Sequence, residues 1–345
     1  MLALVKTENG PGRVQLMEVA EPESGPGEIK IQVAATGVCG TDLHILHGQA
    51  FAVVPPVIMG HEFAGTVTVV GVGVTAWKVG DRVTAEPPAR TCGMCEYCQT
   101  GLPALCPDRR SLGSGVNGAF AAYVVAPAHR VHRLPDSVDF LNGALAEPAA
   151  CCVHAVVEQG HVSAGDVVLV TGPGPMGLLT AQVARAQGAT VLLVGTAEDE
   201  ERLSTGRELG IDIALAAGAG EVQATVARLT AGRGADVVFE CAGAGPAVRT
   251  CLEAVKKRGC YVQVGLLARP IEMDFGQVVA KELKVTGSFG STYTSWERAL
   301  ELMALGKVRT RPLITADLPL VRWEEGFSQM ERKQGCKVVL RPDGA

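Results

Sequence analysis

Short apolar segments interrupted by glycine and proline make up the first third of the chain. Branched and aromatic residues in runs of this length are typical of β-strands, and the glycine and proline clusters between them are typical of turns. We expect strands at residues 14–19, 28–34, 63–70 and 81–85. Together they predict a compact β-rich barrel or sandwich with long loops.

A different pattern begins near residue 166, where apolar runs alternate with helical stretches. Strands that alternate with helices indicate βαβ units in a parallel sheet covered on both faces. In this region we expect strands at residues 167–171, 191–194, 235–239 and 259–265 and helices at residues 178–187 and 201–209. Beyond it, we expect a helix at residues 296–305 and a closing strand at residues 337–340. The fold class is therefore α/β, with a β-rich domain beside a doubly wound parallel sheet.

The composition fits two folded domains and excludes several functions. A chain of 345 residues with 47% hydrophobic and 19% charged residues can build sizeable cores, which excludes intrinsic disorder. A net charge of −5 argues against a nucleic-acid partner. We recognise no apolar run of about 20 residues and no signal peptide, so we expect no membrane partner and a cytoplasmic location. In that reducing compartment, clusters among the 11 cysteines are expected to bind metal.

A glycine-rich turn joins the strand at 167–171 to the helix that follows it. Gly172, Gly174 and Gly177 form a G-x-G-x-x-G pattern, in which glycines allow a tight turn and a close approach of the backbone to a pyrophosphate. The helix N-terminus adds unpaired N–H groups and a partial positive charge. A simple glycine turn is the alternative, but the flanking strand and helix supply the context that dinucleotide binding requires.

The choice between NAD and NADP depends on the end of the second strand of this domain. An acidic residue there usually binds the ribose hydroxyls, but this strand ends at Gly195 and Thr196 without one. Arg202 and Arg207 are candidates for binding a 2′-phosphate, which favours NADP. The acidic residues 198–201 favour NAD, unless they only form a solvated helix start. Both cofactors stay open, and the acidic run inclines the prediction slightly to NAD.

Four cysteines lie close together in the pattern C-x2-C-x2-C-x7-C. They are Cys92, Cys95, Cys98 and Cys106. Four thiolates can close a tetrahedron around Zn²⁺, and such a site is structural because no position stays open for a substrate. An iron–sulfur cluster would fit the proline after Cys106 but not the spacing, and unbound thiols are the remaining alternative.

A second candidate metal site combines Cys39 with His61 and Glu62. Their spacing matches no zinc pattern by itself, and Cys39 alone would more often be a small buried residue. The context changes this interpretation, because the chain resembles the zinc-dependent medium-chain dehydrogenases, in particular the branch of sorbitol and threonine dehydrogenases. The resemblance covers nearly the whole length and rests on motifs in the family's order: residues 37–44, 60–62, 79–83, the four-cysteine lobe, 147–148 and 172–177.

The resemblance implies a catalytic zinc ion held by Cys39, His61 and Glu62, with water or substrate in the fourth position. Glu147 stands where ordinary alcohol dehydrogenases have a second cysteine ligand. It is expected to be either a ligand or a base that acts through water, so the third ligand is Glu62 or Glu147.

Two further residues, Thr41 and His44, match the family's proton relay. The loop between Cys39 and His61, which includes Phe51, is shorter than in sorbitol dehydrogenases and is expected to border the substrate pocket. Cys151 and Cys152 follow Glu147 closely in the sequence and are alternative ligands, but they are expected to pack in the core.

The family's domain organisation is also implied. A GroES-like β-rich catalytic domain would span residues 1–148 and 286–345 and carry the zinc lobe at about 86–110, and a Rossmann domain would span residues 149–285. The expected cofactor contacts all lie in the Rossmann domain: Gly172, Gly174, Met176, Gly177, Gly195, Thr196, Arg202, Val264, Gly265 and Leu266.

The activity implied is oxidation of a secondary alcohol to a ketone, with two zinc ions per chain and NAD or NADP as cofactor. Polyols, vicinal diols and L-threonine-like compounds are the expected substrates, and a homotetramer or homodimer is the expected assembly. Two alternatives share the fold: a zinc-free NADPH-dependent quinone or enone reductase, and a non-enzymatic nucleotide-binding protein. The candidate zinc ligands argue against the first, and the same ligands with the relay residues argue against the second.

Overall fold

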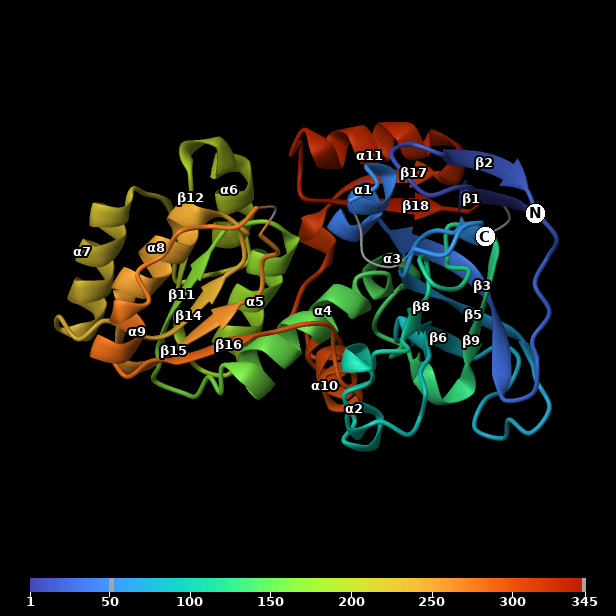
Figure 1. The fold of residues 1–345 in the computed structure, drawn as a ribbon, viewed down its shortest axis with the longest axis horizontal. Helices are drawn as coiled ribbons and strands as arrows, with labels where there is room; N and C mark the ends of the chain where they lie inside the picture. Colours follow the sequence, from blue (N-terminus) through green and yellow to red (C-terminus); the bar gives the residue numbers. More distant parts are fainter. Residues whose placement is uncertain (50–52, 268, 343–345) are drawn as a thin grey trace. The chain divides into compact units, whose positions relative to one another are not determined.

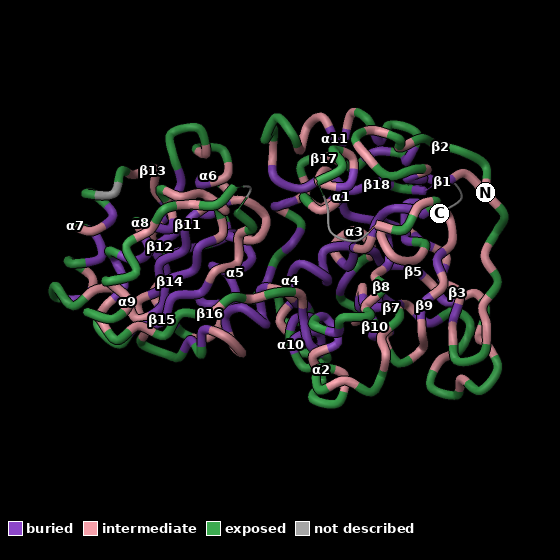
Figure 2. Tube along the Cα trace, viewed as in Figure 1, coloured by how far each residue is buried: buried purple, intermediate pink, exposed green. Residues whose placement is uncertain are grey.

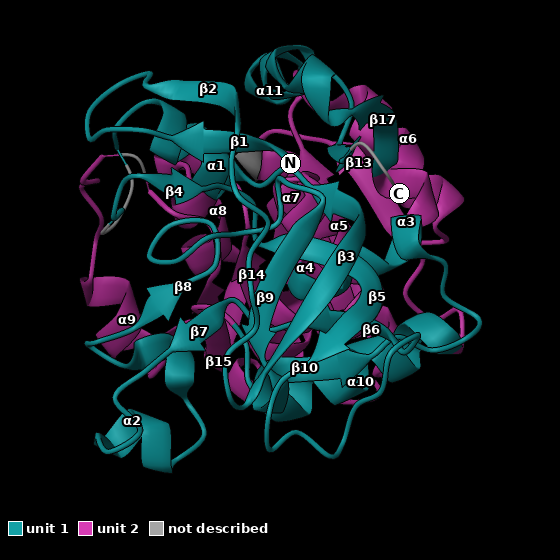
Figure 3. Ribbon diagram, turned by 90° about the vertical axis from the view of Figure 1, so that its right-hand side faces the viewer, with its two compact units in different colours: residues 1–147, 291–304, 314–345 teal, residues 148–290, 305–313 magenta. Residues whose placement is uncertain are grey.

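The chain divides into two compact units in the computed structural model, which describes residues 1–49, 53–267 and 269–342 (Figure 3). Unit 1 contains residues 1–147, 291–304 and 314–345, and unit 2 contains residues 148–290 and 305–313. Residues 148, 286–290 and 305–313 were expected in the first domain and instead belong to unit 2. Phe51, expected beside the substrate pocket, lies outside the described residues.

Unit 1 is built on mostly antiparallel sheets. The largest has seven strands in the order β10-β6-β5-β3-β18-β17, with β9 also paired to β3, and two smaller sheets have the orders β2-β1-β4 and β7-β8. The strands are β1 Leu2–Lys6, β2 Val14–Glu18, β3 Glu28–Gly37, β4 Val57–Ile58, β5 Glu62–Val70, β6 Arg82–Ala85, β7 Pro88–Arg90, β8 Arg110–Ser111, β9 Tyr123–Pro127, β10 Val131–Arg133, β17 Ile314–Pro319 and β18 Lys337–Arg341. The expected β-rich domain is confirmed.

Alternation along β3 explains the core of this unit. Ile29, Ile31 and Val33 share one face of the strand and pack with Phe63 and Val67 of β5. The helices of this unit are α1 Gly40–Leu46, α2 Glu96–Gln99, α3 Phe140–Gly143, α10 Tyr293–Ala304 and α11 Trp323–Glu331, of which α11 packs against β17 and β18. The chain passes from unit 1 into unit 2 within α4, Ala146–Val153.

Unit 2 is a parallel sheet with helices on both faces (Figure 1). Its strand order is β13-β12-β11-β14-β15-β16, and every pairing is parallel. The elements are β11 Val167–Thr171, α5 Pro175–Ala186, β12 Thr190–Gly195, α6 Glu200–Glu208, β13 Ile213–Ala216, α7 Ala219–Thr230, β14 Ala235–Glu240, α8 Gly245–Ala254, β15 Val255–Gln263, α9 Gly276–Ala280 and β16 Lys284–Gly287. The order reverses between β11 and β14, which is where doubly wound sheets bind nucleotides.

The central strands of unit 2 are continuous apolar runs because both faces of the sheet are covered. β11, β12 and β14 are buried along almost their whole length (Figure 2). The predicted doubly wound sheet is thus confirmed, with local shifts: α5 begins at Pro175 rather than at residue 178, and β15 begins at Val255 rather than at residue 259. Proline suits the first turn of a helix because it lacks only an N–H that has no partner there. Among the described residues, no helix combines the length and the apolar character that crossing a membrane requires.

The motif at residues 79–83 stabilises unit 1 through an ion pair. Asp81, 5% exposed, accepts hydrogen bonds from Arg133 of β10 at 3.0 and 3.2 Å. These bonds lower the pKa of the carboxyl group below its usual value of 3.8. Because the folded-state pKa is depressed, the stabilisation is present above the unfolded pKa and is lost as pH falls through the folded pKa.

We expect Asp81→Asn to lower the free energy of unfolding at pH 7 by about 1–2 kcal/mol. The difference between the variant and the wild type should begin to shrink below about pH 4 and should disappear as pH falls through the lowered pKa of the folded state, where the wild-type carboxyl group becomes neutral. Urea unfolding from pH 7 to pH 3 measures both. A difference that stayed constant with pH would show that the charge of Asp81 does not stabilise the fold.

Candidate functional site

Three neighbouring strands bring the candidate catalytic residues of unit 1 together. β3 pairs with β5 so that Gly37 lies opposite Glu62, and on its other side β3 pairs with β18 so that Gly37 lies opposite Val339. Cys39 follows β3 at the start of α1, and Lys337 begins β18. A Cβ at Gly37 would lie 2.3 Å from Glu62 Oε2, so only glycine leaves room for this carboxylate.

The ligand atoms of Cys39, His61 and Glu62 all lie within 4.8 Å of one another. A thiolate, an imidazole and a carboxylate are ligands that Zn²⁺ binds, and three of them leave the fourth position open, as in catalytic sites. Oε2 of Glu62 is buried and has the Lys337 ammonium group as its cationic neighbour, at 2.5 Å. The donor set of thiol, imidazole and carboxylate fits zinc.

Two charged residues that the sequence analysis did not single out surround the triad. Asp42 is fully buried, accepts a hydrogen bond from the Cys39 N–H at 2.8 Å, and places Oδ1 4.0 Å from His61 Nδ1. Lys337, also buried, donates to Glu62 Oε1 at 2.7 Å and lies 2.5 Å from Oε2. Carboxylates near ligand histidines orient the ring, and Lys337 fixes the Glu62 carboxylate.

These neighbours govern the charge on His61. Burial disfavours the imidazolium, but the electrostatic and hydrogen-bond interactions with Cys39, and after them those with Asp42 and Glu147, raise the pKa of His61 well above its usual value of 6.5. Only the neutral imidazole is a metal ligand, so a metal ion would compete with a proton for His61.

Of the other expected catalytic residues, Thr41 and Glu147 lie near the triad. Thr41 Oγ1 is 3.7 Å from Cys39 Sγ. Glu147 interacts electrostatically with His61 and Lys337 but is not part of the group of close ligand atoms. His44 lies on α1 three residues after Thr41, and therefore on the same side of the helix. No hydrogen bond joins Thr41 to His44 among the described residues, so a relay through both needs water or a substrate hydroxyl between them.

The four lobe cysteines converge around one point. Their sulfur atoms lie 3.5 Å (Cys95–Cys98), 3.6 Å (Cys92–Cys106) and 3.9 Å (Cys92–Cys98) apart. A tetrahedron with Zn–S bonds of about 2.3 Å has S–S edges of about 3.8 Å, so the lobe fits zinc. Backbone N–H groups of Met94 and Cys95 lower the pKa of the Cys92 thiol to about 6, which favours the thiolate that zinc needs.

In unit 2, the glycine loop after β11 has a distinct role for each glycine. Gly172 has φ +87°, and a Cβ on Gly177 would lie 1.9 Å from the Gly172 carbonyl oxygen, so both must be glycine for the turn to close. A Cβ on Gly174 would meet nothing within 4 Å. Gly174 is the N-cap residue of α5 and leaves an open space at the helix N-terminus, where a pyrophosphate fits. Met176 is held in the first turn of α5, where its carbonyl accepts from Cys152 Sγ at 3.3 Å.

The end of β12 corrects one expectation, because an acidic residue does reach it. Asp199 Oδ2 accepts hydrogen bonds from the N–H and the hydroxyl of Thr196, each at 2.9 Å, and Arg202 Nη1 lies 4.0 Å from Oδ1. A Cβ on Gly195 would lie 2.9 Å from Asp199 Cβ, so the glycine permits this approach. The T-x-x-D spacing of a capping box was the signal that would have predicted it.

The remaining expected cofactor residues follow β15. The N–H groups of Val264 and Gly265 donate to the Glu240 carbonyl at 2.9 and 2.8 Å, and a Cβ on Gly265 would lie 2.4 Å from Gly243 N. Leu266 is exposed. All expected cofactor residues thus lie in unit 2 at the carboxyl ends of its strands.

Comparison with known proteins identifies the family. Residues 25–136 match the alcohol dehydrogenase GroES-like domain, and residues 175–305 match the zinc-binding dehydrogenase domain. The chain is 42% identical to the sorbitol dehydrogenase of Halalkalibacterium halodurans over 99% of both chains. It is 35% identical to the D-arabitol-phosphate dehydrogenase of Enterococcus avium over 99% of this chain and 97% of that one. A solved structure of a putative zinc-binding dehydrogenase from Sinorhizobium meliloti 1021, bound to NADP, is 32% identical with a TM-score of 0.88 over 99% of both chains.

The fold, together with the four-cysteine lobe and the group of Cys39, His61 and Glu62, defines a two-domain oxidoreductase of the alcohol dehydrogenase class. More particularly, the chain belongs to the zinc-dependent medium-chain dehydrogenases, in the branch that contains the sorbitol dehydrogenases.

Proposed function

We propose that this protein oxidises a secondary alcohol bearing an adjacent polar group, with polyols and vicinal diols first and L-threonine-like compounds second. The observation that carries the proposal is the oxygen-rich candidate zinc site, in which Glu62 is a proposed ligand and Glu147 lies in the same electrostatic environment. Carboxylate oxygens can accept hydrogen bonds from a second substrate hydroxyl or an ammonium group. A site with buried acceptors discriminates against an analogue that leaves them unpaired.

We assign the following roles to the residues. When bound, zinc would supply Lewis-acid chemistry and NAD or NADP would accept the hydride. Cys39, His61 and Glu62 would hold the metal and leave one position open. Glu147 would bind the adjacent polar group of the substrate. Thr41, close to Cys39, and His44, further along α1, would carry the alcohol proton away from the site.

Butane-2,3-diol and butan-2-ol test the substrate class, because they differ only in the adjacent hydroxyl. We expect kcat/KM of the zinc-loaded enzyme to be at least about 100-fold higher for the diol, which corresponds to about 2.7 kcal/mol. Sorbitol, arabitol phosphate and L-threonine complete the panel, with ethanol as the simple primary alcohol. Turnover of butan-2-ol or ethanol above every diol, polyol and amino alcohol would contradict the substrate class and leave the dehydrogenase family unaffected.

The cofactor is proposed to be NAD or NADP, with NAD favoured because of Asp199. Its carboxylate stands at the end of β12, where a 2′-phosphate would meet like charge. We expect Asp199→Asn, which keeps an oxygen to cap Thr196, to raise the NADP-to-NAD ratio of kcat/KM about tenfold, or about 1.4 kcal/mol. Glu198→Gln removes an exposed carboxylate of the same acidic run and serves as the matched control. A shift of equal size in both variants would assign the effect to overall charge rather than to Asp199.

We also infer a homo-oligomer, a dimer or a tetramer, in the cytoplasm. β16 is an edge strand of the unit 2 sheet. Its Val285 is exposed, as are Phe275 at the N-cap of α9 and Val279 within that helix. An open edge with apolar side chains supports pairing with a second chain. The thiolates among the proposed zinc ligands support a reducing compartment. Sedimentation equilibrium measures the assembly.

A further inference from the structure

Residues 305–313 form a segment that lies between two parts of unit 1 in the sequence but packs with unit 2. Gln182, a buried residue of α5, holds it through two hydrogen bonds to the Arg309 backbone. Its amide oxygen accepts from the Arg309 N–H at 2.8 Å, and its amide nitrogen donates to the Arg309 carbonyl at 3.2 Å. The Arg309 guanidinium donates to the Glu208 carbonyl at 2.8 Å. The segment is therefore fixed on unit 2 by the backbone and the side chain of Arg309.

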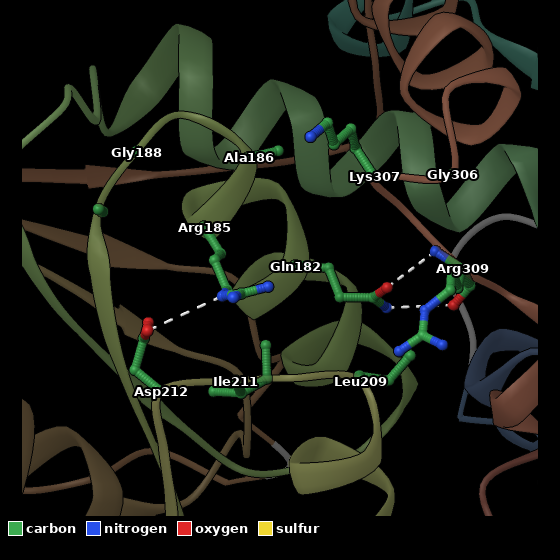
Figure 4. A pocket seen from close by; sticks show the side chains of 11 residues that line it. Gln182, Arg185, Ala186, Gly188, Leu209, Ile211, Asp212, Gly306, Lys307 and Arg309 are labelled. Carbon is green, nitrogen blue, oxygen red and sulfur yellow. Dashed lines mark hydrogen bonds and ion pairs between the residues drawn. The ribbon is translucent and has the colours of Figure 1, made fainter.

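A cavity of about 570 Å³ lies between this segment and the body of unit 2 (Figure 4). Its volume falls within the range of small-molecule sites. The walls come from the end of α5, the turn before β12, the turn before β13 and the segment itself: Gln182, Arg185, Ala186, Gly188, Ala189, Leu209, Ile211, Asp212, Gly306, Lys307 and Arg309.

The cavity is separate from the proposed dinucleotide site. Gly188 and Ala189 precede β12, whereas Gly195 and Thr196 stand at its other end. A strand of six residues is about 20 Å long, so a ligand of ordinary size cannot occupy both places. The cavity therefore has no part in the chemistry assigned above.

Its lining carries more positive than negative charge. The titratable side chains on it are the cations Arg185, Lys307 and Arg309 and one carboxylate, Asp212. Asp212 is only loosely paired with Arg185, at 3.8 Å from Oδ1 to Nε, and its other oxygen accepts the Val191 N–H at 2.9 Å. Lys307 is exposed and forms no ion pair with any described residue. Two positive charges thus remain uncompensated around one concave surface.

We propose that this cavity binds a small organic dianion, with a phosphate or carboxylate group between Arg185 and Lys307. Arginine presents a planar fork that matches either group, and lysine adds a point charge. In Figure 4 the Arg185 side chain comes from α5 and Lys307 from the segment, so a bound anion would join the segment to the helix. Binding would stabilise unit 2 by mass action, independently of substrate turnover.

Calorimetric titration of the enzyme, saturated with zinc and with the preferred cofactor, tests the proposal. Glycerol 3-phosphate and malonate are the two probes, because they separate phosphate from carboxylate recognition, and glycerol is the uncharged reference. Saturation with cofactor removes competition at the glycine loop. We expect one of the two anions to bind, glycerol not to bind, and the affinity to fall with added salt.

Matched variants locate the binding. Arg185→Gln and Lys307→Gln should each weaken it about tenfold, the loss expected for a hydrogen bond to a charged group. Lys257→Gln, an exposed lysine of unit 2 that does not line the cavity, should leave it unchanged. Lys307 is exposed and makes no side-chain hydrogen bond or ion pair with a described residue, and thermal unfolding of Lys307→Gln at the wild-type temperature would show that its fold is retained. Binding of neither anion, or binding retained in both cavity variants, would overturn the proposal.

Discussion

Replacing Cys39 by alanine is expected to lower kcat/KM by at least about 1,000-fold, or about 4 kcal/mol of transition-state stabilisation, with the fold retained. Cys39 supplies the only sulfur atom of the proposed catalytic site, and its backbone N–H, which holds Asp42, is unaffected by the substitution. Two remaining ligands bind zinc weakly and leave the alcohol without Lewis-acid activation. The zinc content of the same samples should fall from two ions per chain to one.

Cys95→Ala is the matched comparison, because it also removes one thiolate ligand from one zinc site. Here the loss should appear in stability, since a structural zinc site contributes folding free energy to the lobe. Thermal unfolding is therefore expected to shift for Cys95→Ala and to change little for Cys39→Ala. Near-normal activity of the Cys39 variant with one zinc ion fewer would show that the metal at this site is not catalytic.

The features that could be predicted from the sequence are those whose residues all lie within one short segment of the chain. The glycine loop and the cysteine lobe each lie within a short segment, and backbone geometry within such a segment is fixed by the residues themselves. Gly172 and Gly177 must be glycine for the turn to close, and in the lobe Cys95 and Cys98 lie at the N-cap and in the body of the same short helix, α2. The resemblance to a family added the long-range group of Cys39, His61 and Glu62, which spacing alone did not indicate.

The features that were missed depend on strand pairing or on packing between distant segments. Lys337 is 275 residues from Glu62 and reaches it only because β18 lies beside β3. Residues 305–313 belong to unit 2, where Gln182 binds the Arg309 backbone, and nothing in the sequence around Gln182 indicates that its amide bonds to a residue so far away. Asp199 is the exception, since the capping-box spacing placed its carboxylate at Thr196 and could have been used.

The largest effect on stability is expected from Lys337→Met. The Lys337 and Glu62 side chains are 3% and 1% exposed and form a buried ion pair. Burial alone would lower the pKa of Lys337, but the Glu62 carboxylate raises it above its usual value, so the ammonium group stays charged. Removing one partner of such a pair leaves the other as an unpaired buried charge, which costs about 3–5 kcal/mol.

This cost should be largest without metal, because zinc would compensate the Glu62 charge when Lys337 is gone. Urea unfolding of the zinc-stripped proteins measures it, and tryptophan fluorescence reports on unit 1, since Trp77, Trp296 and Trp323 all lie there. The double variant Glu62→Gln/Lys337→Met removes both charges and should recover part of the loss. If the double variant were no more stable than Lys337→Met, the loss would come from the shape of the lysine side chain. The unpaired carboxylate would then have no part in it, and the role assigned to Lys337 in fixing Glu62 for the metal would lose its support.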